Sequence, residues 1–172
     1  MSARGAAPAP PRPAAFDDVL RLIGGLTYAW SNTESLLIHM IAGLARADKE
    51  TATVVFLTLN TARARLDLVE RLAKLERVDE AEREAVLALT ERIGRLAGMR
   101  NRYNHSIYAF DPESGAARTI LMRIADRKDS LKMGQSTDMD AGALREMEEA
   151  IAALGEVNRE VWRHLRRFAY PL

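Results

Sequence analysis

The stretch VLALTERIGRLAGMRNRYNH, residues 86–105, decides how the chain folds. Its apolar side chains recur in steps of three and four, and this spacing predicts an amphipathic helix. They are Val86, Leu89, Ile93 and Leu96. The next position on the same stripe is Arg100. Because an unpaired charge is costly to bury, we expect Arg100 to have a charged partner or to reach a water-filled cleft.

The composition limits the classes of protein that this chain can belong to. Hydrophobic residues make up 48% of its 172 residues, enough for one domain with a buried core. Cysteine is absent, which excludes disulfides and thiolate zinc sites and fits a reducing cytoplasm. With a net charge of +1, anion binding must come from local basic clusters. No apolar run reaches the roughly 18 residues of a membrane span, and the N-terminus lacks a signal-peptide core. We therefore expect a cytoplasmic protein with no membrane partner.

Helical spacing elsewhere predicts an all-α fold, a four-helix up-down bundle. Residues 1–14 are rich in proline and alanine and are predicted to be a disordered tail, and residues 15–172 a single helical-bundle domain. The predicted helices cover 15–47, 49–77 and 80–105, and a fourth starts near Asp138 or Asp140. Asp48 and Asp79 are the expected N-caps of the second and third helices.

A short β-hairpin is predicted between the third and fourth helices. Residues 106–110 and 118–124 have strand composition, and Asp111–Gly115 between them has the proline and glycine of a turn. Residues 125–139 are polar and are predicted to form a loop.

Glu34 is an acidic residue on the apolar stripe of the first predicted helix. It can either reach solvent at the edge of the stripe or pair with Arg100. If the first three helices run up, down and up, the two residues lie roughly 7 Å apart in height, at about 1.5 Å per residue. An arginine and a glutamate can span that separation.

The end of the 80–105 helix carries residues suited to cleaving a phosphodiester without a metal. The imidazole of His105 can transfer protons near neutral pH. The guanidinium of Arg100 can hold a phosphate through two parallel hydrogen bonds and stabilise developing negative charge. Asn101 can orient either partner, and it lies four residues before His105 on the same face. The RNA 2′-hydroxyl would be the nucleophile.

These residues resemble the signature of HEPN domains, which is an arginine, a polar residue and, after a short spacer, a histidine late in a helix of an all-α bundle. The signature residues here are Arg100, Asn101 and His105. The resemblance covers about residues 15–110 and implies a metal-independent endoribonuclease without a cofactor. It further implies 2′-hydroxyl attack that leaves a cyclic phosphate, at a cleft shared across a homodimer, in a toxin–antitoxin, phage-defence or RNA-processing system.

Carried over to this sequence, the resemblance makes Arg100 and His105 catalytic and Asn101 supporting. We assign supporting or orienting roles to Asn104, Tyr103 and Glu34. Arg95 and Arg102 are the predicted RNA contacts. No metal ligands are predicted, because no two histidines have ligand spacing. RNA and a cognate antitoxin or nucleotidyltransferase are the candidate partners beside a second copy of the chain.

Structural interpretations compete with these roles. His105 can simply favour the dipole at a helix C-terminus, and Arg100 can be a snorkelling side chain at the edge of the core. The whole chain can then be a non-catalytic helical interaction or RNA-binding module, or the antitoxin-like half of a pair. His39 and His164 are predicted to be surface or packing histidines.

Other residues on the helices carry smaller predictions. Extra apolar positions, at Leu36, Met40, Val54 and Phe56, indicate a dimer interface. Arginines 163, 166 and 167 can track an RNA backbone, although a solvated basic face is the commoner interpretation. Trp162 is expected to pack in the core, and Asn158 can fix helix register.

Overall fold

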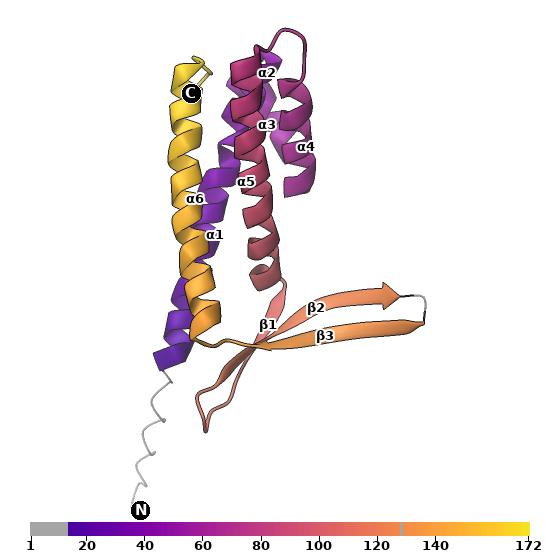
Figure 1. The fold of residues 1–172 in the computed structure, drawn as a ribbon, viewed down its shortest axis with the longest axis vertical. Coiled ribbons are helices and arrows are strands. Elements are labelled where there is room, and N and C mark those ends of the chain that lie inside the picture. Colours follow the sequence, from indigo (N-terminus) through magenta and orange to yellow (C-terminus); the bar gives the residue numbers. More distant parts are fainter. Residues whose placement is uncertain (1–13, 128) are drawn as a thin grey trace, which may run out of the picture.

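The computed structural model describes residues 14–127 and 129–172, and it shows a bundle of helices with a sheet at one end (Figure 1). The helices are α1 (Ala14–Ser35), α2 (Leu37–Ala45), α3 (Lys49–Thr58), α4 (Ala62–Ala73), α5 (Glu80–Asn104) and α6 (Ala141–Arg167). The strands are β1 (Ser106–Phe110), β2 (Ala117–Arg127) and β3 (Ser130–Asp138). The fold is therefore mostly helical but not purely all-α. Except for Ala14, which begins α1, the predicted tail lies outside the described residues.

Acidic N-caps fix the starts of three helices. Asp48 Oδ1 accepts a hydrogen bond from the amide of Thr51 at 2.8 Å, and Asp79 Oδ1 accepts one from the amide of Glu82 at 2.8 Å. Asp140 caps α6 in the same way. Each cap satisfies an amide that the first turn of a helix leaves without a partner. The predicted starts of α3, α5 and α6 are confirmed.

The first predicted helix, 15–47, is broken at Leu36 into α1 and α2. The hydroxyl of Thr33 donates to the carbonyl of Ala29 at 2.8 Å, and that of Ser35 donates to the carbonyl of Asn32 at 3.0 Å. Side-chain bonds of this kind compete with the backbone ladder and bend helices. The prediction of one continuous helix was therefore wrong.

The second predicted helix, 49–77, is also two helices. Thr61 Oγ1 caps α4 by accepting a hydrogen bond from the amide of Ala64 at 3.1 Å. The Leu59–Thr61 break reverses the chain between α3 and α4. α3 packs mainly against α2, whereas α4 packs against α2 and α5.

This reversal changes the direction of α5, which runs antiparallel to α1. Thr27 Oγ1 lies 3.5 Å from Asn104 Oδ1, whereas the Arg100 guanidinium lies 5.9 Å from the ring centre of Trp30, later in α1. The predicted up-down-up order made these helices parallel, and it was wrong because it counted α3 and α4 as one helix.

The core lies between α1, α5 and α6, with α2 and α4 closing it. Its largest fully buried side chains include Leu26, Trp30, Ile93, Met147 and Leu154. The side of α1 that faces the core carries Val19, Leu22 and Leu26, whereas Leu20 is 47% exposed. Asn158 Nδ2 lies 3.4 Å from Thr33 Oγ1 and joins α6 to α1, as a register-fixing residue would. No helix among the described residues is long and apolar enough to cross a membrane.

The predicted hairpin is a three-stranded antiparallel sheet in the order β1-β2-β3. The turn is as predicted: Asp111 Oδ1 accepts a hydrogen bond from the amide of Glu113 at 2.9 Å, and Gly115 has a φ of 71°. The loop prediction for 125–139 was wrong, because 130–138 forms β3. β3 lies at the edge of the sheet, and its residues 134–138 are exposed, so it needs no apolar alternation.

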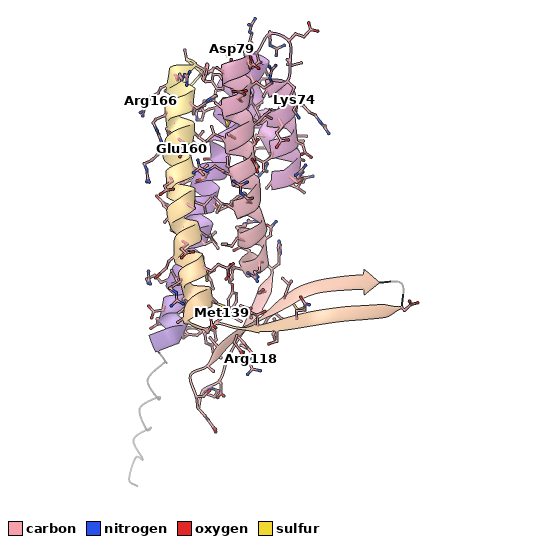
Figure 2. The ribbon with its side chains drawn as sticks, viewed as in Figure 1. Lys74, Asp79, Arg118, Met139, Glu160 and Arg166 are labelled. Carbon is pink, nitrogen blue, oxygen red and sulfur yellow. The ribbon has the colours of Figure 1, made fainter. Side chains whose placement is uncertain are left out.

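The sheet is fixed to the end of α5. Tyr108 donates a hydrogen bond from its hydroxyl to the carbonyl of Tyr103 at 2.8 Å, and the amide of Met122 donates to the carbonyl of His105 at 3.1 Å. Met139 is buried where the sheet meets α6 (Figure 2). The last turn of α5 is therefore held in place by the sheet.

Candidate functional site

A groove of about 870 Å³ lies between the second half of α5 and the N-terminal end of α4, with one side chain from α1. Four arginines, one histidine and three glutamates line it, together with Asn60, Thr61 and Asn101. These arginines, glutamates and the histidine are Glu34, Arg63, Arg65, Glu70, Glu91, Arg95, Arg100 and His105. The first turn of α4 adds the partial positive charge of a helix N-terminus.

Helical spacing gathers the α5 side of the groove. Glu91, Arg95, Gly98 and Asn101 are three or four residues apart and share one face of the helix. A Cβ added at Gly98 would meet nothing within 4 Å, so the glycine leaves an open floor in this stretch of the groove.

Arg100 lies at this groove as a cation without a carboxylate partner. Its Nη1 donates to Asn101 Oδ1 at 3.0 Å, and its guanidinium lies 5.9 Å from the Trp30 ring centre. Its Nε is buried and has no hydrogen-bond partner among the described residues. Among those residues no carboxylate lies within 4.0 Å of it either. A half-buried guanidinium in this state is suited to receive an anion.

Glu34 does not pair with Arg100, so that prediction was wrong. Its carboxylate accepts hydrogen bonds from Arg65 Nη1 and from Trp30 Nε1, each at 2.9 Å. The antiparallel course of α5 removes the height match on which the predicted pair rested. Glu34 lines the groove with its charge already compensated.

Arg65 is the residue that the sequence reasoning missed. Its Nε donates to the carbonyl of Phe56 at 3.1 Å, and its guanidinium lies 4.0 Å from the centre of the Phe56 ring. It therefore closes the last turn of α3 while it pairs with Glu34. The sequence signal that could have identified Arg65 is its position directly before Leu66, which lies on the buried face of α4.

His105 is the first residue after α5, with φ −106° and ψ 17°. Its amide donates to the carbonyl of Asn101 at 3.2 Å, and its carbonyl accepts from Met122 in β2. The backbone is thus held on both sides, and the exposed imidazole lines the groove together with Arg100. His105 is therefore both the C-cap of α5 and a lining residue of the groove.

The remaining predicted residues divide between two surfaces. Arg95 lines the groove and pairs with Glu91. Arg102 and Tyr103 face α6, where Arg102 Nη1 lies 3.2 Å from Glu146 and the Tyr103 hydroxyl donates to the same carboxylate at 3.1 Å. Burial, with the negative charge of Glu146, raises the pKa of Tyr103 to about 12.

Asn104 also points away from the groove, toward Thr27 of α1. The structure therefore brings together Arg100, Asn101, His105, Arg95 and Glu34, and it separates them from Arg102, Tyr103 and Asn104. Because each residue turns the helix by about 100°, consecutive residues of one signature cannot all face one groove.

The other two histidines lie within the bundle. His39 Nδ1 is 2.8 Å from the carbonyl oxygen of Pro171, and its ring lies 5.7 Å from that of Trp162. His164 is buried against Phe168 and Tyr170. Both have packing roles, as predicted. Within residues 14–127 and 129–172, no three His, Cys, Asp or Glu side chains gather in a way that could hold a metal ion.

Comparison of the chain with protein-family models, curated proteins and solved structures found no match.

Proposed function

We propose that this protein is a HEPN-like, metal-independent endoribonuclease whose bundle presents Arg100 and His105 to RNA in the α4–α5 groove. One observation carries the proposal: an arginine with no carboxylate partner and a histidine line the same groove. The first supplies a phosphate-binding group, and the second supplies a proton-transfer group.

The reaction would follow from these two groups. The RNA 2′-hydroxyl attacks the adjacent phosphorus, the O2′–P bond forms and the P–O5′ bond breaks. A neutral imidazole takes the 2′-hydroxyl proton, and an acid protonates the departing 5′-oxygen. Arg100 binds the non-bridging oxygens as negative charge develops, with Asn101 holding its Nη1. The products are a 2′,3′-cyclic phosphate and a 5′-hydroxyl.

A homodimer would supply both proton-transfer groups, since each chain brings one histidine to its groove. We propose a second copy of the chain as the partner. The apolar positions first used to predict a dimer do not support it, because Leu36, Met40 and Phe56 are buried within the chain. The exposed apolar residues left on α3 are Val54 and Leu57.

The setting of the proposed activity is a cytoplasmic toxin–antitoxin or phage-defence system, with an antitoxin or a nucleotidyltransferase as the controlling partner. This rests on the family resemblance.

A non-catalytic RNA-binding or interaction module is the second candidate. One observation favours it: among the described residues, no hydrogen bond orients the His105 ring. Catalytic histidines are usually oriented by such a bond.

The test is cleavage of a defined single-stranded RNA in EDTA, with the 3′ ends analysed for cyclic phosphate. We expect Arg100→Ala and His105→Ala each to lower the rate at least about a hundredfold, the lower end of the range for losing a proton-transfer or charge-stabilising group. Arg102→Ala is the matched control, because this neighbouring arginine faces α6. Full activity in both groove variants would overturn the assignment, and binding without cleavage would favour the second candidate.

A further inference from the structure

The outer side of α6 carries a hollow of about 410 Å³ lined by Arg159, Trp162, Arg163 and Arg166. A second hollow of about 340 Å³ adjoins it, sharing Arg163 and extending to Arg167 and toward α5. We call Arg159, Trp162, Arg163, Arg166 and Arg167 the α6 arginine surface. Figure 2 shows Arg166 near the C-terminal end of this helix, beyond Glu160.

The positive charge of this surface is largely uncompensated. Among the described residues, no carboxylate lies within 4.0 Å of Arg159, Arg166 or Arg167. Arg163 reaches Glu160 only at 4.0 Å, and Glu160 is already bonded to Arg92. Arg63 and Arg102 have close carboxylates, whereas the exposed Arg71, Arg118 and Arg145 lie singly elsewhere on the chain, so what distinguishes the α6 surface is that its unpaired arginines are clustered. The clustered cations therefore remain available to an external polyanion.

The helix dipole does not account for the whole cluster. Basic residues in the last turn of a helix are favoured by the dipole, which explains Arg166 and Arg167. Arg159 lies more than two turns before the end of α6, beyond the reach of that effect. A further reason is needed for cations that extend back along the helix.

Trp162 sits among these arginines, with Arg159 three residues before it, Arg163 directly after it and Arg166 four residues after it. Its indole is half-buried and lies beside His39. It lines the arginine hollow and also a groove between α6 and α1 that contains the exposed Tyr28. An aromatic face flanked by cations is the arrangement that binds single-stranded nucleic acid, because bases stack on the ring while the backbone follows the cations.

We propose that the α6 arginine surface binds single-stranded RNA, with phosphates on Arg159, Arg163 and Arg166 and a base stacked on Trp162. This site is on a different helix from the α4–α5 groove. The inference goes beyond the proposed cleavage activity, and it does not need the groove to be catalytic. A single strand is favoured over a duplex because only unpaired bases expose a face for stacking.

The test is fluorescence anisotropy of an end-labelled twelve-nucleotide oligouridine, in the Arg100→Ala/His105→Ala background so that cleavage cannot interfere. We expect Arg159→Gln/Arg163→Gln/Arg166→Gln to weaken binding at least about tenfold at low salt. The slope of log affinity against log salt should fall by about 2, at about 0.7 for each lost phosphate contact with a single strand. The matched control is Arg21→Gln/Arg71→Gln/Arg145→Gln, which removes the same charge from exposed positions on α1, α4 and the start of α6.

Trp162 provides a second readout, because the chain has two tryptophans and Trp30 is buried. RNA should quench tryptophan emission in the protein with native Trp162 and not in Trp162→Leu, which keeps apolar bulk. Trp162→Leu should also bind about tenfold more weakly, and Trp162→Phe should restore most of the affinity. Unchanged affinity and salt slope in the triple arginine variant would overturn the proposal. So would equal competition by polyglutamate without quenching, which would assign the surface to acidic proteins.

Discussion

Glu34 and Arg65 form a salt bridge of 2.9 Å between α1 and α4, with only 14% and 17% of their side chains exposed. The same two residues also bond Trp30 Nε1 and the carbonyl of Phe56. The pair therefore joins α1, the end of α3 and α4 at the inner side of the groove.

We expect Arg65→Ala to lower the free energy of unfolding by about 3 kcal/mol, since it leaves the Glu34 carboxylate buried without its partner. Urea denaturation followed by circular dichroism measures this. Arg63→Ala is the control, because its pair with Asp67 leaves Arg63 80% exposed and should contribute at most about 1 kcal/mol. Equal losses in the two variants would mean that the Glu34 pair is not buried in solution.

The sequence was a good guide where local chemistry decides the structure. Asp48, Asp79 and Asp140 cap their helices, and β1 covers the expected residues. Each of these features depends on neighbours within a few positions. Local signals of this kind survive whatever the tertiary arrangement is.

The direction of the chain was harder to predict, and the wrong direction of α5 led to a wrong prediction at the site. Asn60 and Thr61 form a break that apolar spacing alone did not reveal, and missing it gave α5 the wrong direction. The predicted Glu34–Arg100 pair depended on that direction and was therefore wrong. Arg100, Asn101 and His105 do share a groove, although the residues between them in the same segment face α6 and α1. β3 was missed because its exposed residues 134–138 carry no apolar alternation.

Gly98 offers a way to obstruct the groove without disturbing the core. We expect Gly98→Ala to raise the free energy of unfolding by up to about 1 kcal/mol, because alanine favours helix more than glycine does and its Cβ meets open space. Gly98→Trp should abolish RNA cleavage while the far-ultraviolet circular dichroism stays unchanged. Gly24→Trp is the matched control, since Gly24 is also helical, exposed and free of neighbours within 4 Å of a Cβ. Full cleavage by Gly98→Trp would place the reaction elsewhere.

If the cleft is shared between two chains, an inactive chain should abolish the cleavage activity of the active chain with which it forms a dimer. With a fivefold excess of His105→Ala and subunit exchange, random pairing leaves about one sixth of wild-type chains in wild-type dimers, so cleavage should fall toward that fraction. Excess Arg102→Ala should instead add activity. Light scattering should give twice the mass of one chain. Undiminished cleavage in the first mixture would show that each chain acts alone.

His164 predicts how stability depends on pH. Burial, with a smaller contribution from the charge of Arg167, lowers the pKa of His164 from 6.5 to about 4. As the pH falls below 6.5, the imidazole of His164 binds a proton in the unfolded chain, whereas in the folded chain it stays neutral until about pH 4. Stability is therefore fully present above pH 6.5, and about 3 kcal/mol of it is lost by pH 4. Urea denaturation at intervals of half a pH unit measures this.

The variant His164→Leu isolates this effect from the other titrating groups. In the native chain the buried Nε2 of His164 has no hydrogen-bond partner among the described residues, so replacing the imidazole with an apolar side chain removes no hydrogen bond at that atom. The free energy of unfolding of the variant at pH 7 should therefore lie within about 1 kcal/mol of the native value. Between pH 6.5 and 4.5 the variant should lose less stability than the native chain, because its unfolded state no longer gains that proton. His39→Leu is not an equivalent change, since His39 Nδ1 lies 2.8 Å from the carbonyl of Pro171 and that contact would be lost. Parallel pH profiles for the native chain and His164→Leu would mean that the imidazole is protonated, and so solvated, in the folded protein.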